Sequence, residues 1–465
     1  MKNKRFLIGN IIVLAACLAF YFLFWAFGET IVTKDAPSYI NMVLSREPFY
    51  PSFLALFRTI FGASTDTWLI AVTFAQSMLQ AVCTYFFIRF FRKHFNAGAF
   101  LTAVLTMLCF SVSLLLQFAA KRSYMYNNSI MTEAICIPLF LLFAVLAMEY
   151  LFSLKIRYLI GASLVSLIMF SSRKQMYITL ILLVGIIIIA EYRRFRDKGN
   201  KKMVSFGKGL LVMLLTAGLL LGINKGFEVT YSYFVNGEAS EHFNDDRFLT
   251  TVIFYVAEPE DAEAIEDPEI RNLFSEIYAI CDSEGSMMHS AEGSLYDRVT
   301  HFAEHYDMIQ INHMWNMIED YAREKIGTDE VGIKRETLVD EISSTISFSV
   351  MPNVWPKLVK LFGMNVVEGM SNSLAKSSPM FYIYSLAMVA LYVLLLIINI
   401  VRKGWNKVNK FGLYAAFSLV GNVCLVSLLR FCQSRYMIYN MPLFYAAFIV
   451  LILDTLKGKG KDVRN

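Results

Sequence analysis

Long apolar stretches, separated by shorter polar segments, set the pattern of this chain. A helix that crosses a bilayer core of about 30 Å needs about 20 apolar residues. Ten stretches are candidates for such helices: 6–27, 67–90, 97–117, 129–150, 157–172, 175–191, 204–223, 379–401, 411–429 and 437–456. The fifth and sixth stretches are short and are separated only by residues 171–174, so we expect a tight helical hairpin or one broken helix there. The pattern predicts an all-α polytopic membrane protein with about ten transmembrane helices, within a range of nine to eleven.

The amino-acid composition supports this interpretation. Of the 465 residues, 56% are apolar and 17% are charged, whereas a soluble globular protein carries about 25% charged residues. This difference argues against a soluble enzyme and against a disordered chain. The 7 cysteines are too few for a scaffold held together by disulfides.

The charges are distributed unevenly along the chain. Residues 225–376 hold 28 of the 38 acidic residues but only 11 of the 43 basic ones. We therefore expect residues 225–378 to form an acidic, mostly helical domain outside the membrane. This domain separates a transmembrane module over 1–224 from C-terminal transmembrane helices and a basic tail over 379–465. The net charge of +5 conceals this division, and it does not indicate a nucleic-acid partner.

Positive charges at the ends of the apolar stretches predict the orientation in the membrane. The loops at every second boundary carry 23 basic residues, against 9 in the shorter loops that face the other way. Cytoplasmic loops of membrane proteins carry such an excess. We therefore expect a multi-pass protein of the cell membrane with both termini cytoplasmic and residues 225–378 extracytoplasmic. The first apolar run continues past Cys17 to Trp25, which is longer than a signal peptide requires, so we expect this span to remain as an anchor.

Within the acidic segment, two local patterns predict structure. The apolar spacing over Ser294–Ile326 predicts one or two amphipathic helices. Pro352 and Pro356, on either side of Trp355, are expected to mark a bend before the next span.

The first outer loop, residues 28–65, is much longer than the roughly 2–8 residues that connect helices in a bundle. Two short amphipathic helices fit this loop, one from Ala36 and one from Pro51, and they would lie along the outer surface. Asp35 stands where the first of these helices would begin. Two interpretations of its carboxylate remain open: a cap that stabilises the helix, or a general base that takes a proton from an acceptor hydroxyl.

Four segments on the expected outer side share the pattern of a known family. They are Asp35-x-x-x-Tyr39 with Arg46-x-Pro48-x-Tyr50-Pro51, Thr132-Glu133 with Pro138, Ser171-Ser172-Arg173-Lys174-Gln175, and Arg435-Tyr436 with Pro442. In this order they resemble the GT-C glycosyltransferases, which include the protein O-mannosyltransferases and the lipid A aminoarabinose transferases. The resemblance covers about 1–190 and 430–445 and does not extend to the acidic segment.

The resemblance implies a membrane glycosyltransferase whose donor is a polyprenyl-phosphate sugar held in membrane lipid. A hydroxyl of an extracytoplasmic acceptor, either glycan, lipid or protein, would attack the anomeric carbon with inversion while Asp35 removes its proton. Fixed cations would stabilise the departing phosphate. The candidates for phosphate binding are Arg173, Lys174, Arg435, Arg46 and Arg122. The candidates for orienting the acceptor are Tyr39, Tyr50, Glu133 and Tyr436.

These candidates also have structural interpretations. The cations could extend to lipid head groups, and Glu133 could form a plain buried salt bridge. Many members of the resembled family have two acids close together in the first loop, whereas here Asp35 is followed by Ala36. We therefore expect no obligatory metal or other cofactor.

A competing motif lies in the acidic segment. His301-x-x-Glu304-His305 matches the spacing with which two histidines on one helical face bind zinc in some metalloproteases. Nothing else in the chain resembles a protease, and the polar face of an amphipathic helix explains the same residues.

Two other classes of function remain as alternatives. A Wzy-like polysaccharide polymerase or O-antigen ligase also has many spans, a large outer loop and functional arginines, but it lacks the long first loop with its Asp and Pro-x-Tyr-Pro pattern. A membrane transporter would place charges or Gly/Pro breaks near the middle of its spans, and the spans here are nearly free of such charges.

Overall fold

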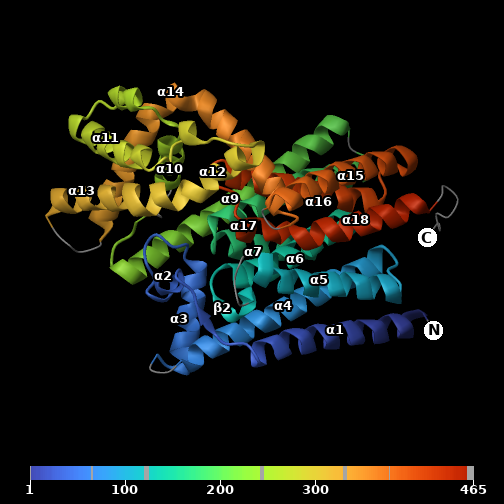
Figure 1. Ribbon diagram of the computed structural model, residues 1–465. Helices are drawn as coiled ribbons and strands as arrows, with labels where there is room; N and C mark the ends of the chain where they lie inside the picture. Colours follow the sequence, from blue (N-terminus) through green and yellow to red (C-terminus); the bar gives the residue numbers. More distant parts are fainter. Residues whose placement is uncertain are drawn as a thin grey trace. The chain divides into compact units, whose positions relative to one another are not determined.

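The computed structural model shows that the protein is mainly helical (Figure 1). It describes residues 2–63, 66–119, 125–199, 201–240, 246–327, 332–375 and 378–457. Eight helical segments in this part of the chain are long and apolar enough to cross a membrane: Phe6–Ala26, Thr67–His94, Glu133–Ser153, Lys174–Asp197, Lys202–Asn236, Pro379–Lys403, Lys407–Ser427 and Ser434–Leu456. The mainly helical fold class is therefore confirmed, and the apolar helices are consistent with a membrane protein, while the number of spans stays a prediction.

The other two predicted stretches also form helices, α5 (Ala99–Ala119) and α7 (Ile156–Phe170). The expected hairpin is present as well. Helix α7 is joined to α8 (Tyr177–Asp197) through a short 3₁₀ turn, η2 (Lys174–Met176), and the two helices pack against each other.

The chain divides into two compact units, each described here by itself. The first unit comprises residues 1–228, 386–421 and 438–465, and the second comprises residues 229–385 and 422–437.

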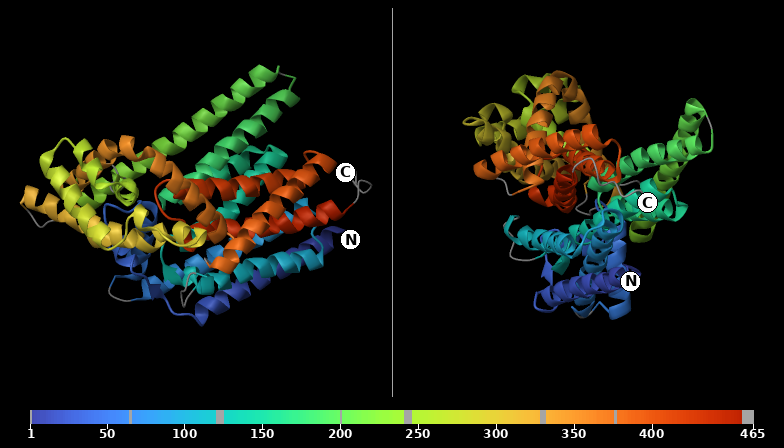
Figure 2. Two further views of the ribbon diagram at one scale, coloured as in Figure 1. Left: turned by 45° about the horizontal axis from the view of Figure 1, so that its top comes forward. Right: turned by 90° about the vertical axis from the view of Figure 1, so that its right-hand side faces the viewer.

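The first unit is a helical bundle around one central helix, α6 (Glu133–Ser153). The other helices wholly or largely in this unit are α1 (Lys2–Ala26), α4 (Thr67–His94), α5, α7, α8, α9 (Lys202–Asn236), α15 (Pro379–Lys403), α16 (Lys407–Ser427) and α18 (Met441–Leu456). Helix α1 lies along α4 (Figure 2). Helices α4 and α7 each pack against α6. Helix α6 is apolar on all sides and 83% of its most apolar window is buried, as expected for a helix inside a bundle. In α9 only 11% of that window is buried, so this helix exposes an apolar surface suited to lipid.

At one end of this bundle, basic side chains pair with buried acids. Lys93 Nζ and His94 Nε2, at the end of α4, lie 2.6 and 2.9 Å from Glu149 Oε1 of α6. Arg194 of α8 lies 2.7 Å from Glu191. The Lys93 and His94 contacts join α4 to α6, whereas the Arg194–Glu191 pair lies within α8. All these residues lie near the loops that the sequence predicts to be cytoplasmic.

The second unit is built on a long helix, α14 (Ile333–Asn372). Packed with it are α10 (Asp246–Val256), α11 (Pro268–Ser283), α12 (Leu295–Asp307), the π-helical stretch η5 (Met308–Trp315) and α13 (Asn316–Ile326). Short 3₁₀ turns η3 (Pro259–Ala264) and η4 (Met288–Ser290) and the one-turn helix α17 (Ser434–Met437) complete the described elements of this unit. Their shared core includes Phe254, Phe274, Ile277 and Ile346, all of which are fully buried.

The two local predictions for this segment have different outcomes. Residues 295–326 are continuously helical, and the Ser294 side chain accepts a hydrogen bond from the Asp297 backbone N–H at the start. By contrast, α14 continues through both Pro352 and Pro356, so the prolines lie inside a helix, and the bend expected there stays a prediction. Buried Val350 and Val354 pack this part of the helix into the core, which holds the helix together despite the missing backbone donors.

Candidate functional site

The first outer loop forms two short helices, α2 (Ala36–Ile40) and α3 (Phe49–Phe61). They lie at the end of α1 that is remote from the N-terminus (Figure 1). A two-residue strand, β1 (Ile31–Val32), precedes α2 and pairs in parallel with β2 (Ser129–Ile130), which follows the 3₁₀ turn η1 (Tyr126–Asn128) and leads into α6. The Thr33 hydroxyl adds a bond of 3.1 Å to the Ile130 carbonyl. These contacts attach the first loop to the N-terminal end of α6.

The same loop is attached to the turn between α7 and α8. The Phe49 backbone N–H donates to the Ser171 carbonyl at 2.9 Å. The Lys174 backbone N–H donates to Glu47 Oε1 at 3.1 Å. Three of the four segments that carry the family resemblance are therefore neighbours at one end of the first unit.

Asp35 directly precedes α2, but its side chain makes no capping hydrogen bond. Its Oδ1 instead lies 3.8 Å from Nη2 of Arg46, and the Asp35 side chain is 40% exposed. The Arg46 guanidinium is fixed by a bond of 2.8 Å from Nε to Ser38 Oγ and by stacking over the Tyr39 ring, 4.6 Å from its centre. A solvent-accessible carboxylate thus stands beside an oriented guanidinium.

Glu133 and Arg173 form the second charged pair of this end. Glu133 Oε1 lies 2.6 Å from Arg173 Nη1, and the glutamate is only 2% exposed. Thr132 Oγ1 accepts from Arg173 Nη1 at 3.3 Å and donates to Glu133 Oε2 at 3.2 Å. Gln175 Oε1 accepts from Arg173 Nε at 3.1 Å. The buried salt bridge left open for Glu133 is therefore present, and it also orients Arg173.

Tyr39 lies between the two charged pairs. Burial raises the pKa of its hydroxyl to about 12, and the nearby Arg46 guanidinium opposes this shift. Glu133, Arg173 and Glu47 are also close enough to act on the hydroxyl electrostatically. Because both pairs act on one side chain, the first-loop residues and the Glu133–Arg173 pair belong to one polar group.

The Tyr50 ring packs against the Tyr39 ring. Their ring centres are 5.2 Å apart in an edge-to-face arrangement. The Tyr50 hydroxyl donates to Gln76 Oε1 at 2.9 Å, and Gln76 Nε2 donates to the carbonyls of Asn127 and Ser129 at 3.1 Å each. In this structure Tyr50 is fully buried, so it acts as a support for the polar group.

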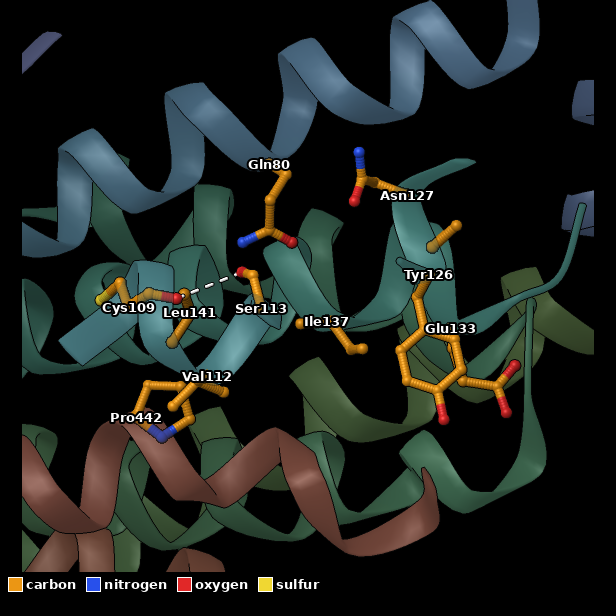
Figure 3. A pocket seen from close by; sticks show the side chains of 11 residues that line it. Gln80, Cys109, Val112, Ser113, Tyr126, Asn127, Glu133, Ile137, Leu141 and Pro442 are labelled. Atoms are coloured by element: carbon orange, nitrogen blue, oxygen red, sulfur yellow. Dashed lines mark hydrogen bonds between the residues drawn. The ribbon is translucent and has the colours of Figure 1, made fainter. Parts of the chain in front are cut away.

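A small cavity lies next to Glu133, between α4, α5, α6 and α18 (Figure 3). Its polar wall is formed by Gln80, Ser113, Tyr126, Asn127 and Glu133. About 20 Å³ is open to a water-sized molecule, which is room for roughly one water and not for a sugar. Of these residues the sequence analysis identified only Glu133, although Gln80, a polar residue within an apolar helix, was an available signal.

Comparison of the chain with protein-family models and with curated proteins finds no match.

The remaining predicted phosphate ligands are Arg122, Arg435 and Lys174. Arg122 falls outside the described residues. Arg435 and Tyr436 belong to the second unit, where Arg435 Nη2 donates to the Tyr436 hydroxyl at 2.9 Å. Lys174 begins the turn η2 in the first unit, and its backbone contact with Glu47 fixes the start of this turn.

Both histidines of the His301-x-x-Glu304-His305 motif make contacts with other protein groups. His301 Nδ1 and the Tyr255 hydroxyl are 3.0 Å apart, and His305 Nδ1 contacts the His301 carbonyl at 2.9 Å. Burial lowers the pKa of His301 to about 4, and neighbouring His305 acts in the same direction. Over the described ranges, no three His, Cys, Asp or Glu side chains gather closely enough to hold a metal ion.

Proposed function

We propose that the protein is a membrane glycosyltransferase that transfers a sugar from a polyprenyl-phosphate donor to an extracytoplasmic hydroxyl, with inversion and without an obligatory metal. The observation that carries this proposal is the polar group at one end of the first unit. There the exposed Asp35 carboxylate lies beside Arg46, and Arg46 stacks on the Tyr39 ring. The Glu133–Arg173 pair is close enough to act electrostatically on the Tyr39 hydroxyl.

The geometry supports a division of roles within this group. Asp35 is the base because its carboxylate is accessible to an acceptor, whereas Glu133 is buried against Arg173. The acceptor oxygen bonds to the anomeric carbon, its proton passes to Asp35, and the bond from that carbon to the phosphate oxygen breaks. The phosphate leaves with the bonding electrons, and nearby guanidiniums stabilise its charge.

Support for the membrane-surface location comes from the charges of the first unit. Its polar group lies at one end of the bundle. At the opposite ends of the helices, next to the basic loops, Lys93, His94 and Arg194 pair with buried glutamates. The excess of positive charge in those loops favours a cytoplasmic position for them. Asp35 would then face the outside.

The proposal is tested with the full chain in nanodiscs, a radiolabelled polyprenyl-phosphate sugar and a mixture of envelope acceptors. General-base catalysis contributes roughly 100- to 10,000-fold to a rate, so Asp35→Asn should reduce label transfer by that factor. Asp66→Asn, which removes an exposed acid that precedes α4, serves as the matched control and should transfer at the wild-type rate.

Two results would contradict the proposal in different ways. Equal transfer by wild type and Asp35→Asn would remove Asp35 from the mechanism. Wild-type protein that binds the donor but transfers no label to any envelope fraction would count against the transferase itself.

A further inference from the structure

The middle of α14 carries apolar side chains on two of its faces. On one face, Val350 and Val354 are buried in the core of the second unit. On another face, Phe348, Trp355 and Val359 are 61%, 60% and 55% exposed. Residues seven and four positions apart lie on the same side of an α-helix. The helix therefore presents an apolar strip, formed by these three residues, to its surroundings.

This strip has the properties of an interaction surface. Single exposed apolar residues are common on proteins, but a row of large apolar side chains marks a contact with a partner or a membrane. Pro352 is also exposed and lies on the same side of the helix, between Phe348 and Trp355. Two aromatic rings and a proline thus leave no polar group along this part of the strip.

The charges around the strip indicate which kind of surface covers it. Residues 342–367 contain two lysines and no acidic residue, although the acidic segment as a whole holds 28 of the chain's 38 acidic residues. Lys357 pairs with Glu258 at 2.7 Å, whereas Lys360, directly after Val359, is exposed. An anionic surface would therefore repel most of the acidic segment but attract this part of α14.

The connection of α14 to the next helix brings lipid head groups within reach. Helix α14 ends at Asn372, and α15, which is long and apolar enough to cross a membrane, begins at Pro379. Within the second unit the Ser385 hydroxyl donates to the Ser371 carbonyl at 3.0 Å, so the start of α15 is attached to the end of α14. Val359 lies about 20 Å along the helix from Asn372. If α15 crosses the membrane, this contact holds α14 beside the bilayer surface.

We propose that the apolar strip of α14 docks on a bilayer surface that contains anionic lipids. Aromatic side chains favour the zone between head groups and acyl chains, and a lysine beside them extends its ammonium group to the lipid phosphates. Phe348 and Trp355 supply the rings, and Lys360 supplies the charge. The inference goes beyond the proposed transfer reaction, because it assigns a membrane contact to the second unit whether or not a sugar is transferred.

Quenching of Trp355 fluorescence by brominated lipid tests the docking. The full chain is placed in nanodiscs of anionic lipid whose acyl chains carry bromine near the head-group end. The difference between wild type and Trp355→Phe gives the emission of Trp355, because the four other tryptophans contribute equally to both proteins. We expect most of this emission to be lost in brominated lipid compared with the same lipid without bromine.

An indole on an acidic face of the same unit is the matched control. Ile280 of α11 is exposed, and Glu276 and Glu284 lie one helical turn before and after it. Ile280→Trp is combined with Trp355→Phe, and the emission of the introduced indole is obtained by subtracting that of Trp355→Phe alone. This emission should be the same with and without bromine.

The lysine gives an independent measurement. One lysine near an anionic membrane surface strengthens binding about fivefold. Lys360→Gln should therefore weaken docking by about this factor, so that a larger fraction of anionic lipid is needed for the same quenching of Trp355. Lys334→Gln, which makes the same charge change at an exposed position near the start of α14, should behave as the wild type.

Three results would overturn the proposal. Trp355 emission that is insensitive to brominated lipid but is quenched by acrylamide would show that the strip faces water. Emission insensitive to both quenchers would show that protein covers the strip, as in a contact with a second copy of the chain. Equal quenching in anionic and neutral lipid, with no effect of Lys360→Gln, would show that the surface recognised is not anionic. Each result leaves the test of Asp35 in sugar transfer unaffected, so the two proposals can fail separately.

Discussion

Two arginines of the second unit stack on aromatic rings but differ in their charged partners. Arg247, at the start of α10, is 1% exposed and lies 5.0 Å above the Trp315 ring. It contacts three carboxylates, those of Glu336 at 2.5 Å, Asp340 at 3.3 Å and Glu319 at 3.5 Å. Arg430 stacks on three rings and, over the described ranges, has no carboxylate partner.

The difference separates an arginine held by both packing and charge from one held by aromatic packing alone. The partners of Arg247 come from α13 and α14, so this side chain joins three helices through charge and packing. Over the described ranges, Arg430 has the packing without the charged partners. Loss of Arg247 should therefore reduce stability strongly, and loss of Arg430 should reduce it much less.

The largest effect is expected for Arg247→Met. Removing one member of a buried ionic cluster typically costs about 3–5 kcal/mol, because it leaves uncompensated charges. We expect a loss of this size in the free energy of unfolding of the second unit, measured by denaturant titration of the full chain with Trp315 fluorescence as a local probe.

A double variant sharpens the test. Arg247→Met combined with Glu336→Leu removes both members of the shortest pair, and it should be more stable than Arg247→Met alone. A single variant as stable as wild type would mean that Arg247 is not a structural clamp.

Glu368 is the opposite case to Arg247, because over the described ranges this buried acid has no basic partner. Glu368 of α14 is 4% exposed, and burial raises its pKa to about 8, helped by the charge of Glu304 and opposed by a hydrogen bond from Asn372. The unfolded chain releases this proton near pH 4.5, whereas the folded chain keeps it until about pH 8. The stability that depends on Glu368 is therefore complete below pH 4.5 and is lost as the pH rises through 8.

We expect Glu368→Gln to remove this dependence on pH. The variant should be as stable as wild type at pH 5 and more stable at pH 8, by on the order of 3 kcal/mol, since each pKa unit corresponds to about 1.4 kcal/mol. Unfolding titrations at the two pH values measure the difference. Parallel pH profiles for both proteins would show that Glu368 does not hold its proton in the folded state.

Much of the fold was predictable because it follows from apolar periodicity. All ten apolar stretches form helices, and the turn at residues 171–174 forms the expected hairpin. Pro352 and Pro356 do not end their helix, because Val350 and Val354 on the same helix are buried in the core and hold it in place. Local patterns of this kind give element positions, and tertiary packing then decides where an element ends.

The candidate site was less predictable. Nothing in the sequence indicates that residues 31–32 pair with 129–130, because the pairing involves two residues on each side and joins segments almost a hundred positions apart. Arg430 was missed for the same reason. Its rings come from positions 248, 306 and 436, and only the folded chain brings them together.

The smallest effect on stability is expected for Arg430→Gln. Each cation–π contact at a partly exposed site contributes about 0.5–1 kcal/mol, and relief from an unbalanced charge offsets part of this loss. We therefore expect the free energy of unfolding to fall by about 1 kcal/mol or less, measured by the same titration as for Arg247→Met. A loss as large as that of Arg247→Met would make Arg430 a second structural clamp, and the contrast between the two arginines would disappear. A small loss would show that aromatic packing alone contributes little to stability, and that the carboxylates provide most of the stabilising effect of Arg247.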